Sequence, residues 1–472
     1  MRVVSSAVTN VLHDPSHKAW IFLQHGFCRA LIALKFLILA RLLGPEAVGL
    51  LTIALIALAA AEALTETGLI TALVQRESAL TAEQINAVWT ILLLRGAAIA
   101  ALFALCATWI AAILGVTEAG ALIIWIGLIP LLRNSASIGI PLAQRERNFR
   151  TLGLLQIATT GTDLLLSVML IYLMGDVLAV VVAMIIAESL RTICSHIVFA
   201  TRPIPTRHLA PAQPFIHYGK WVWGSTLVTF FLNQFDKVLV AHLLGQAQVG
   251  LYQMVQKLAQ LFIADLAYAL GQYLFPVFAQ NNRDNREQLD AKFISVLGFV
   301  SSASLLTALY IALLAPWLVE TILGSQWLPG VNAFRILCLS TCMGAVMAAL
   351  VAYIRSIGAP HRITYAAVLQ AAIFLPGGWF GGQQFELEGI AISVAAAISA
   401  AVLYLVLTLQ LPSRLFFNTV LTGAWITISA AMVIAALHMS IDSQVFRLAA
   451  TSITYVALVM YMFKLFLKRE PV

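Results

Sequence analysis

The chain has 472 residues, of which 61% are hydrophobic and only 10% are charged, and its mean hydropathy is +0.92. Soluble domains are about 45–50% apolar and about 25% charged, so this composition excludes a soluble globular protein and, more firmly, a disordered chain. The net charge of +7 is expected to come from basic residues in the loops on one side of a membrane. Nucleic acid is therefore not expected as a partner.

Long apolar segments follow one another along the whole chain. A membrane crossing needs about 20 mainly apolar residues. The sequence therefore predicts an all-α polytopic membrane protein with 14 transmembrane helices. The predicted helices cover residues 20–41, 47–74, 87–114, 119–142, 152–174, 177–199, 218–242, 249–279, 293–318, 331–354, 363–381, 389–411, 416–438 and 446–467.

The connections between these helices alternate in charge. One set holds nearly all the basic loop residues, for example those in 145–150, 202–207 and 283–292, and the C-terminal 464–469. The opposite set holds only Arg41 and Arg447. Because basic loops stay in the cytoplasm, both termini are predicted to be cytoplasmic.

A short pattern occurs twice, 201 residues apart: residues 40–50 read ARLLGPEAVGL and residues 241–251 read AHLLGQAQVGL. Six predicted helices separate the copies, so the two halves enter the membrane from the same face as parallel repeats. The predicted organisation is an N-terminal six-helix lobe (1–200), a cytoplasmic linker (201–217), a C-terminal six-helix lobe (218–411) and two additional helices (412–472). A substrate path is expected between the lobes. Chance recurrence in a leucine-rich chain is the alternative.

Nine basic and six acidic residues lie inside the predicted helices. Each would cost roughly 2.5–3.5 kcal/mol at the centre of a spanning helix, so they are expected to face a water-filled cavity or to pair with one another. They are Arg29, Lys35, Arg95, Arg133, Arg191, Lys220, Lys237, Lys257, Arg335, Glu62, Glu66, Asp163, Glu188, Asp236 and Asp265.

Two groups of polar residues are candidates for substrate binding. Arg29 and Lys35 lie in the first predicted helix, Arg29 near mid-depth. The eighth predicted helix carries a stripe with the spacing i, i+3, i+4, i+7 on one face. Its members are Gln253, Gln256, Lys257 and Gln260. Amides beside an ammonium suit anionic, hydroxyl-rich ligands, whereas snorkelling of Lys35 and interhelical hydrogen bonding of the glutamines are the structural alternatives.

The acidic residues are candidates for ion coupling or gating. Glu62 and Glu66 share one helix face at i, i+4, and they could equally be structural partners of Arg29 or Arg95. Asp236 is the repeat equivalent of Lys35, which favours a salt bridge that gates the path, with interface snorkelling as the alternative. Asp265 is a further coupling candidate.

Two smaller groupings are expected to be structural. Glu188 and Arg191, three residues apart, predict an intrahelical pair. Asp163 is expected to join Arg95 and Arg133 in a similar network in the N-terminal lobe.

Several motifs resemble the Wzx-type O-antigen and exopolysaccharide flippases of the MOP superfamily, which also holds the lipid II flippase and the MATE antiporters. They are LARLLGPE at 39–46, ETGL at 66–69, DK at 236–237, GLY at 250–252, FP at 275–276 and LGSQW at 323–327. Arg29, Lys35 and Arg41 match the spacing of basic residues in the lipid II flippase, although Lys35 replaces an Arg and Phe36 replaces an acidic residue.

The resemblance implies that the chain moves an undecaprenyl-diphosphate-linked oligosaccharide from the cytoplasmic to the periplasmic leaflet of the bacterial inner membrane, by alternating access and with ion coupling. It also implies, as further partners, the glycan polymerase and glycosyltransferases of the same pathway. No cofactor or metal is expected.

Two other functions are alternatives to this one. A MATE-like drug antiporter should have an acidic, aromatic site, and the excess of bases over acids argues against it. An enzyme, which is not expected, would need a sizeable extramembrane loop with paired acids. Glu386 and Glu388 form the close acidic pair outside the membrane, on a short predicted loop.

Overall fold

The computed structural model of the chain describes residues 15–76, 78–262, 286–409, 413–441 and 443–467. Within these ranges every regular element is a helix, which confirms the predicted all-α class. The chain divides into two compact units, Met1–Gly250 and Leu251–Val472, which we call unit 1 and unit 2. This division falls after residues 218–242, which the sequence assigns to the C-terminal lobe. The lobe boundaries drawn from the repeat therefore stay a prediction.

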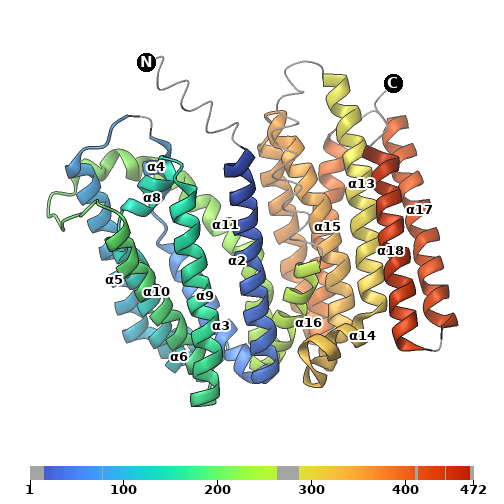
Figure 1. Ribbon diagram of the computed structural model, residues 1–472, viewed down its shortest axis with the longest axis horizontal. Coiled ribbons are helices and arrows are strands. Elements are labelled where there is room, and N and C mark those ends of the chain that lie inside the picture. The colour runs from blue at the N-terminus through green and yellow to red at the C-terminus, as the bar shows by residue number, and fades with distance from the viewer. Residues whose placement is uncertain (1–14, 77, 263–285, 410–412, 442, 468–472) are drawn as a thin grey trace. The chain divides into compact units, whose positions relative to one another are not determined.

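Unit 1 is a bundle of long helices with four short ones between them, α4 (Leu69–Gln75), α6 (Gly120–Ile126), α7 (Leu128–Ser135) and α8 (Gly139–Arg145) (Figure 1). Its long helices are α2 (Pro15–Leu42), α3 (Pro45–Leu64), α5 (Ala82–Ile113), α9 (Phe149–Met174), α10 (Leu178–Val198) and α11 (Gln213–Leu244).

The apolar segment 47–74, predicted as one helix, is broken into α3 and α4. The chain turns at Gly68, whose φ of 63° lies in the left-handed region that favours glycine. The start of α11 packs closely on this turn, since a Cβ atom on Gly219 would lie 1.8 Å from the carbonyl oxygen of Thr67. Further along α11, Trp223 donates its indole N–H to the carbonyl oxygen of Leu64 at 3.0 Å. This bond satisfies a carbonyl at the end of α3 that has no partner within the helix.

The segment 119–142 is also broken. A bend of 57° separates Thr117–Ser135 from Gly139–Arg145, which includes α8. Next to the bend, the indole of the buried Trp89 in α5 donates to the carbonyl oxygen of Ala136 at 3.0 Å. The backbone carbonyl of Ala136 at the bend therefore lies inside unit 1, where the indole of Trp89 is its hydrogen-bond donor.

The two copies of the repeated sequence contact each other through their glycines. A Cβ atom on Gly49 would lie 1.9 Å from the carbonyl oxygen of Gln246, and one on Gly250 would lie 1.9 Å from that of Pro45. The two contacts join equivalent positions of the two copies in reciprocal fashion, as a two-fold relation requires. The glycines are therefore needed because two helix starts cross with their backbones in contact.

Unit 2 begins within a helical segment that the structure describes as far as residue 262. Helix α13 (Arg286–Leu313) packs against α15 (Val331–Ser356), α17 (Ser413–Ser440) and α18 (Gln444–Leu467) (Figure 1). The helices that follow residue 285 are α13 (Arg286–Leu313), α14 (Ala315–Leu318), α15 (Val331–Ser356), α16 (His361–Thr408), α17 (Ser413–Ser440) and α18 (Gln444–Leu467).

Helix α16 is a hairpin of two arms. The backbone leaves helical geometry at Phe385 and Glu386. Its two ends meet, because Arg362 donates to the carbonyl oxygen of Thr408 at 2.7 Å. The arms correspond to the predicted helices 363–381 and 389–411, with Glu386 at the turn between them.

Ten described helices are long and apolar enough to cross a membrane, and the bent segment that ends in α8 makes up to eleven. This confirms a polytopic membrane protein. The number fourteen stays a prediction for three reasons. It counts the two arms of α16 separately, it includes residues 20–41 in α2, which is not among these helices, and it includes the segment 249–279, of which residues beyond 262 lie outside the described ranges. The outer faces of α5 and α9 expose large apolar side chains, such as Leu105, Trp109 and Tyr172, as expected for contact with lipid.

Candidate functional site

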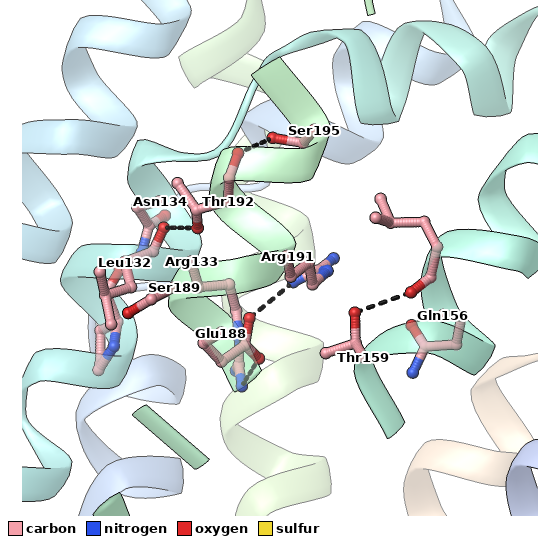
Figure 2. A network of polar contacts seen from close by, with 12 residues as sticks. Leu132, Arg133, Asn134, Gln156, Thr159, Glu188, Ser189, Arg191, Thr192 and Ser195 are labelled. Atoms are coloured by element: carbon pink, nitrogen blue, oxygen red, sulfur yellow. Dashed lines mark hydrogen bonds and ion pairs between the residues drawn. The ribbon is translucent and has the colours of Figure 1, made fainter. Parts of the chain in front are cut away.

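Charged side chains inside unit 1 form a network that centres on Arg133 of α7. One guanidinium nitrogen of Arg133 contacts Glu62 Oε1 of α3 at 2.8 Å, and another contacts Glu188 Oε1 of α10 at 3.0 Å. The second oxygen of Glu188 contacts Arg191 at 3.2 Å, which confirms the predicted intrahelical pair. Figure 2 shows Arg191 extending from α10 toward Gln156 and Thr159 of α9. Arg133 therefore links three elements that are far apart in sequence.

A second ion pair lies at the end of α3, where Arg95 of α5 approaches Glu66 to 3.4 Å. Arg95 also donates to the carbonyl oxygen of Glu62 at 2.7 Å and to the hydroxyl of Thr65 at 3.1 Å. A cation that binds the last carbonyls of a helix offsets the negative end of its dipole. The interpretation of Glu66 as a partner of Arg95 thus agrees with the structure, and Glu62 is held by Arg133 instead.

Lys35 lies in a separate ion pair. Its ammonium group is 2.7 Å from both carboxylate oxygens of Asp163 in α9, and the Lys35 side chain is only 11% exposed. The expected network of Asp163 with Arg95 and Arg133 is wrong, because Asp163 faces α2. A buried charge needs a partner within direct reach, and packing of α2 on α9 makes Lys35 that partner.

Asp236 and Lys237 pair within α11, with 3.3 Å between carboxylate and ammonium. The ammonium of Lys237 also donates to the carbonyl oxygen of Asn233 at 2.7 Å. Both side chains are buried. Asp236 is thus paired within its own helix, and Lys35, its repeat equivalent, is paired with Asp163. The gating role of Asp236 stays a prediction.

A cavity of about 290 Å³ lies between α2 and α9, and we call it the Arg29 cavity. Arg29 and Arg191 both line it, together with Gln24 and Gln156, and its lining residues include no carboxylate. Gln24 Oε1 is shielded from solvent and has no hydrogen-bond partner within the described part of the chain. Arg191 contacts Glu188 through one guanidinium nitrogen, which leaves its other N–H groups for the cavity. Two guanidinium groups and two amides in a lining that itself carries no carboxylate suit this cavity to an anion.

Two further cavities of unit 1 continue from the first, each sharing wall residues with the one before it. The network cavity, of about 280 Å³, is lined by the Arg133 and Arg95 ion pairs and shares Arg191 with the Arg29 cavity. The α3–α11 cavity, of about 380 Å³, shares Glu62 and Glu66 with the network cavity. The candidate site is therefore a row of three adjoining cavities whose charge changes from basic at one end to acidic at the other.

The predicted stripe of the eighth helix lies in unit 2. Its four residues are partly exposed, whereas the residues between them, such as Met254, Val255 and Leu258, are buried. This burial pattern agrees with one polar face on a packed helix. Binding of substrate by Gln253, Gln256, Lys257 and Gln260 stays a prediction, and Asp265 lies outside the described residues.

The sequence analysis missed the polar residues of α11 that line the α3–α11 cavity, namely Ser225, Thr226 and Thr229. The signal was present, because Ser225, Thr229 and Asn233 recur every four residues along α11 and so share one helix face. In the described part of the chain, no group of three or more His, Cys, Asp or Glu side chains is placed to hold a metal ion.

Comparison with known proteins gives the chain a family context. A family model described as "Polysaccharide biosynthesis protein" matches residues 38–332. The lipopolysaccharide biosynthesis protein WzxC of Escherichia coli K12 is 21% identical over 75% of this chain and 72% of its own length. The succinoglycan biosynthesis transport protein ExoT of Rhizobium meliloti is 24% identical over 72% of this chain and 69% of its own length.

Solved structures of the same fold include transporters. The lipid II flippase MurJ in an inward closed conformation matches with a TM-score of 0.78 and 12% identity over 94% of this chain and 98% of its own. An inward-facing MATE multidrug transporter of the MOP superfamily matches with a TM-score of 0.61 and 16% identity over 85% of this chain and 94% of its own. At such identities the likeness concerns the fold alone.

Proposed function

Because the chain belongs to the polysaccharide biosynthesis protein family, as a Wzx-type member of the MOP superfamily, we propose that it is a flippase for an undecaprenyl-diphosphate-linked oligosaccharide. The cargo moves from the cytoplasmic to the periplasmic leaflet of the bacterial inner membrane, and both termini of the chain are cytoplasmic. The glycan polymerase and glycosyltransferases of the same pathway are the proposed partners.

The Arg29 cavity is the observation that carries this proposal. A diphosphate brings about two negative charges, and moving it into the membrane costs the hydration of those charges. The guanidinium groups of Arg29 and Arg191 can each donate two parallel hydrogen bonds to phosphate oxygens. The amide of Gln24 adds a donor once it is rotated to present nitrogen. The amide nitrogen of Gln156 donates one hydrogen to Thr160 at 3.3 Å and has a second hydrogen to offer.

Alternating exposure of this cavity to the two leaflets would move the headgroup while the lipid tail stays in the bilayer. Such a cycle is a shift between two conformations that bind the cargo differently. Coupling to an ion gradient would supply net work, about 2.3 kcal/mol per charge for each 100 mV.

A drug antiporter is less well supported. An organic cation would need carboxylates available for it, but Glu62 contacts Arg133 at 2.8 Å and Glu66 contacts Arg95 at 3.4 Å. In the Arg29 cavity, the ionisable lining residues are Arg29, Arg191, His25 and Cys28, which do not attract a cation.

The test is export in cells that depend on this protein as their sole flippase. The measurement is the fraction of lipid-linked glycan that a membrane-impermeant periplasmic reagent can reach. Arg29→Ala should lower the export rate by about tenfold or more, the loss expected for charge-assisted hydrogen bonds worth roughly 1.5–3 kcal/mol. Arg29→Lys should retain part of the rate.

Arg150→Ala is the matched control, because Arg150 is an exposed residue at the start of α9, outside the cavity lining. Its export should equal that of the unmodified protein. Unchanged export in Arg29→Ala at normal protein level would remove Arg29 from the site and leave the proposed headgroup cavity without support.

A further inference from the structure

We infer that the α3–α11 cavity is a subsite for the uncharged sugar rings of the cargo, distinct from the Arg29 cavity that takes the diphosphate. This inference rests on the proposed function, since it assumes a lipid-linked glycan as cargo. It assigns glycan recognition to α11, where the sequence analysis had placed no substrate-binding residue.

The walls of the cavity are polar on both sides. Helix α11 contributes hydroxyl and amide side chains at positions three or four residues apart, which places them on one face. Helix α3 contributes the carboxylates of Glu62 and Glu66, and Phe230 adds an aromatic surface. The residues of α11 that carry the hydroxyl and amide groups are Ser225, Thr226, Thr229, Asn233 and Gln234.

Several of these groups have hydrogen-bonding capacity left over. Within the described residues, the hydroxyl of Thr226 and the side-chain amides of Asn233 and Gln234 have no partner, and Glu62 uses only Oε1 for Arg133. By contrast, the hydroxyl of Thr229 donates to the carbonyl oxygen of Ser225. Amide donors beside carboxylate acceptors are complementary to a ring that bears several hydroxyl groups, each of which can donate and accept.

The balance of charge selects a neutral ligand. Glu62, Glu66 and Glu188 are matched by Arg133, Arg95 and Arg191, to which they are joined by the ion pairs already described. The lining of the α3–α11 cavity itself contains two carboxylates and no basic residue, so it offers a diphosphate no cationic partner.

A free cation is also disfavoured, because it would have to compete with guanidinium groups already in contact with the two carboxylates. A sugar hydroxyl, in contrast, can donate to Glu62 Oε2 without displacing Arg133. The cavity volume of about 380 Å³ lies within the range of roughly 300–1,000 Å³ that is usual for small-molecule sites.

The order of the three cavities matches the order of groups in such a cargo. The Arg29 cavity adjoins the network cavity through Arg191, and the network cavity adjoins the α3–α11 cavity through Glu62 and Glu66. A lipid-linked glycan has its diphosphate at one end of the sugar chain. Its headgroup and its sugars can therefore occupy neighbouring cavities of unit 1.

The test compares binding of two lipids to the purified full-length protein in detergent, by native mass spectrometry. One is undecaprenyl diphosphate without sugar, and the other is undecaprenyl diphosphate that carries the complete repeating unit from the host strain. The variant is Thr226→Val combined with Asn233→Ala, and each single variant is measured beside it. Thr341→Val in unit 2 is the matched control, since its hydroxyl donates to Leu337 of its own helix.

The double variant should bind the glycan-bearing lipid about tenfold more weakly, as expected for two lost hydrogen bonds, and each single variant about threefold more weakly. Its affinity for the sugar-free lipid should not change. Equal weakening of both lipids, or no weakening of either, would overturn the assignment. So would a variant that alters only the dependence of binding on Na⁺ or on pH, because that result identifies a cation site.

Arg29→Ala separates this inference from the proposed function. It should weaken binding of both lipids, because both carry the diphosphate. If Arg29→Ala left both affinities unchanged while the double variant still lost the glycan-bearing lipid, the headgroup site would be wrong and the sugar subsite would stand.

Discussion

The ion pair between Lys35 and Asp163 offers a sharp test of which intramembrane charges are structural. The Lys35 ammonium contacts both carboxylate oxygens at 2.7 Å, and the side chains are 11% and 24% exposed. Ser167 adds a hydrogen bond to Asp163 at 3.4 Å. The prediction is that Lys35 stabilises the packing of α2 on α9 and does not contact the cargo.

Lys35→Met leaves the Asp163 carboxylate in apolar surroundings without its counter-charge. Loss of one partner from a buried pair costs about 3–5 kcal/mol. We expect the lower end, about 3 kcal/mol, because Asp163 is one-quarter exposed. At roughly 2–4 °C per kcal/mol for a unit of this size, the unfolding temperature should fall by about 6–12 °C.

The compensating variant is Lys35→Met combined with Asp163→Leu, which replaces the pair by apolar side chains. Such replacement is often neutral for stability, so most of the lost unfolding temperature should return. Stability is measured as the thermal unfolding temperature of the detergent-purified protein, with size-exclusion chromatography as the detection method. Transport is measured by the export assay described above. Lys35→Arg keeps the charge and should lose little of either.

The two measurements together can refute the structural interpretation. If the double variant is as stable as the unmodified protein and exports normally, Lys35 is structural. If it is stable but does not export, Lys35 acts on the cargo or in the cycle, as the sequence analysis allowed. If Lys35→Met alone leaves the unfolding temperature unchanged, the ion pair contributes nothing and the reasoning from burial fails.

Three other predictions follow from the packing of unit 1. Gly49→Ala should prevent accumulation of folded protein, because the new Cβ would lie 1.9 Å from a carbonyl oxygen. The measurement is the amount of the protein in the membrane fraction. Gly44→Ala is the control and should accumulate normally, because its Cβ would have no atom within 4 Å. Trp89→Phe should lower the free energy of unfolding by about 1–3 kcal/mol, because the buried carbonyl of Ala136 loses its 3.0 Å donor; an unchanged denaturation midpoint would contradict this. Arg133→Met should lower the free energy of unfolding by about 2 kcal/mol, between the values for exposed and buried ion pairs. In a double-mutant cycle, Arg133→Met combined with Glu188→Gln should lower it by less than the sum of the two single changes.

Sequence alone determined the class of the protein and the local features of its helices. Apolar length predicts membrane-spanning helices because a chain in lipid must satisfy its backbone hydrogen bonds internally. The pairing of Glu188 with Arg191 was also predictable, because residues three apart on a helix are neighbours whatever surrounds the helix. The repeat at 40–50 and 241–251 likewise indicated equivalent helix starts, and the reciprocal contacts of Gly49 and Gly250 agree with that.

Only the tertiary structure decided which charges meet across helices. The sequence required the buried carboxylates and cations to find partners, but Asp163 has the same chemistry whether it faces Arg95, Arg133 or Lys35. The packing of α2 on α9 placed it on Lys35, and the packing of α7 on α10 placed Arg133 beside Glu188 and within reach of Glu62. Ion pairs act over a few ångströms, so their choice depends on helix rotation and depth, which apolar periodicity leaves open.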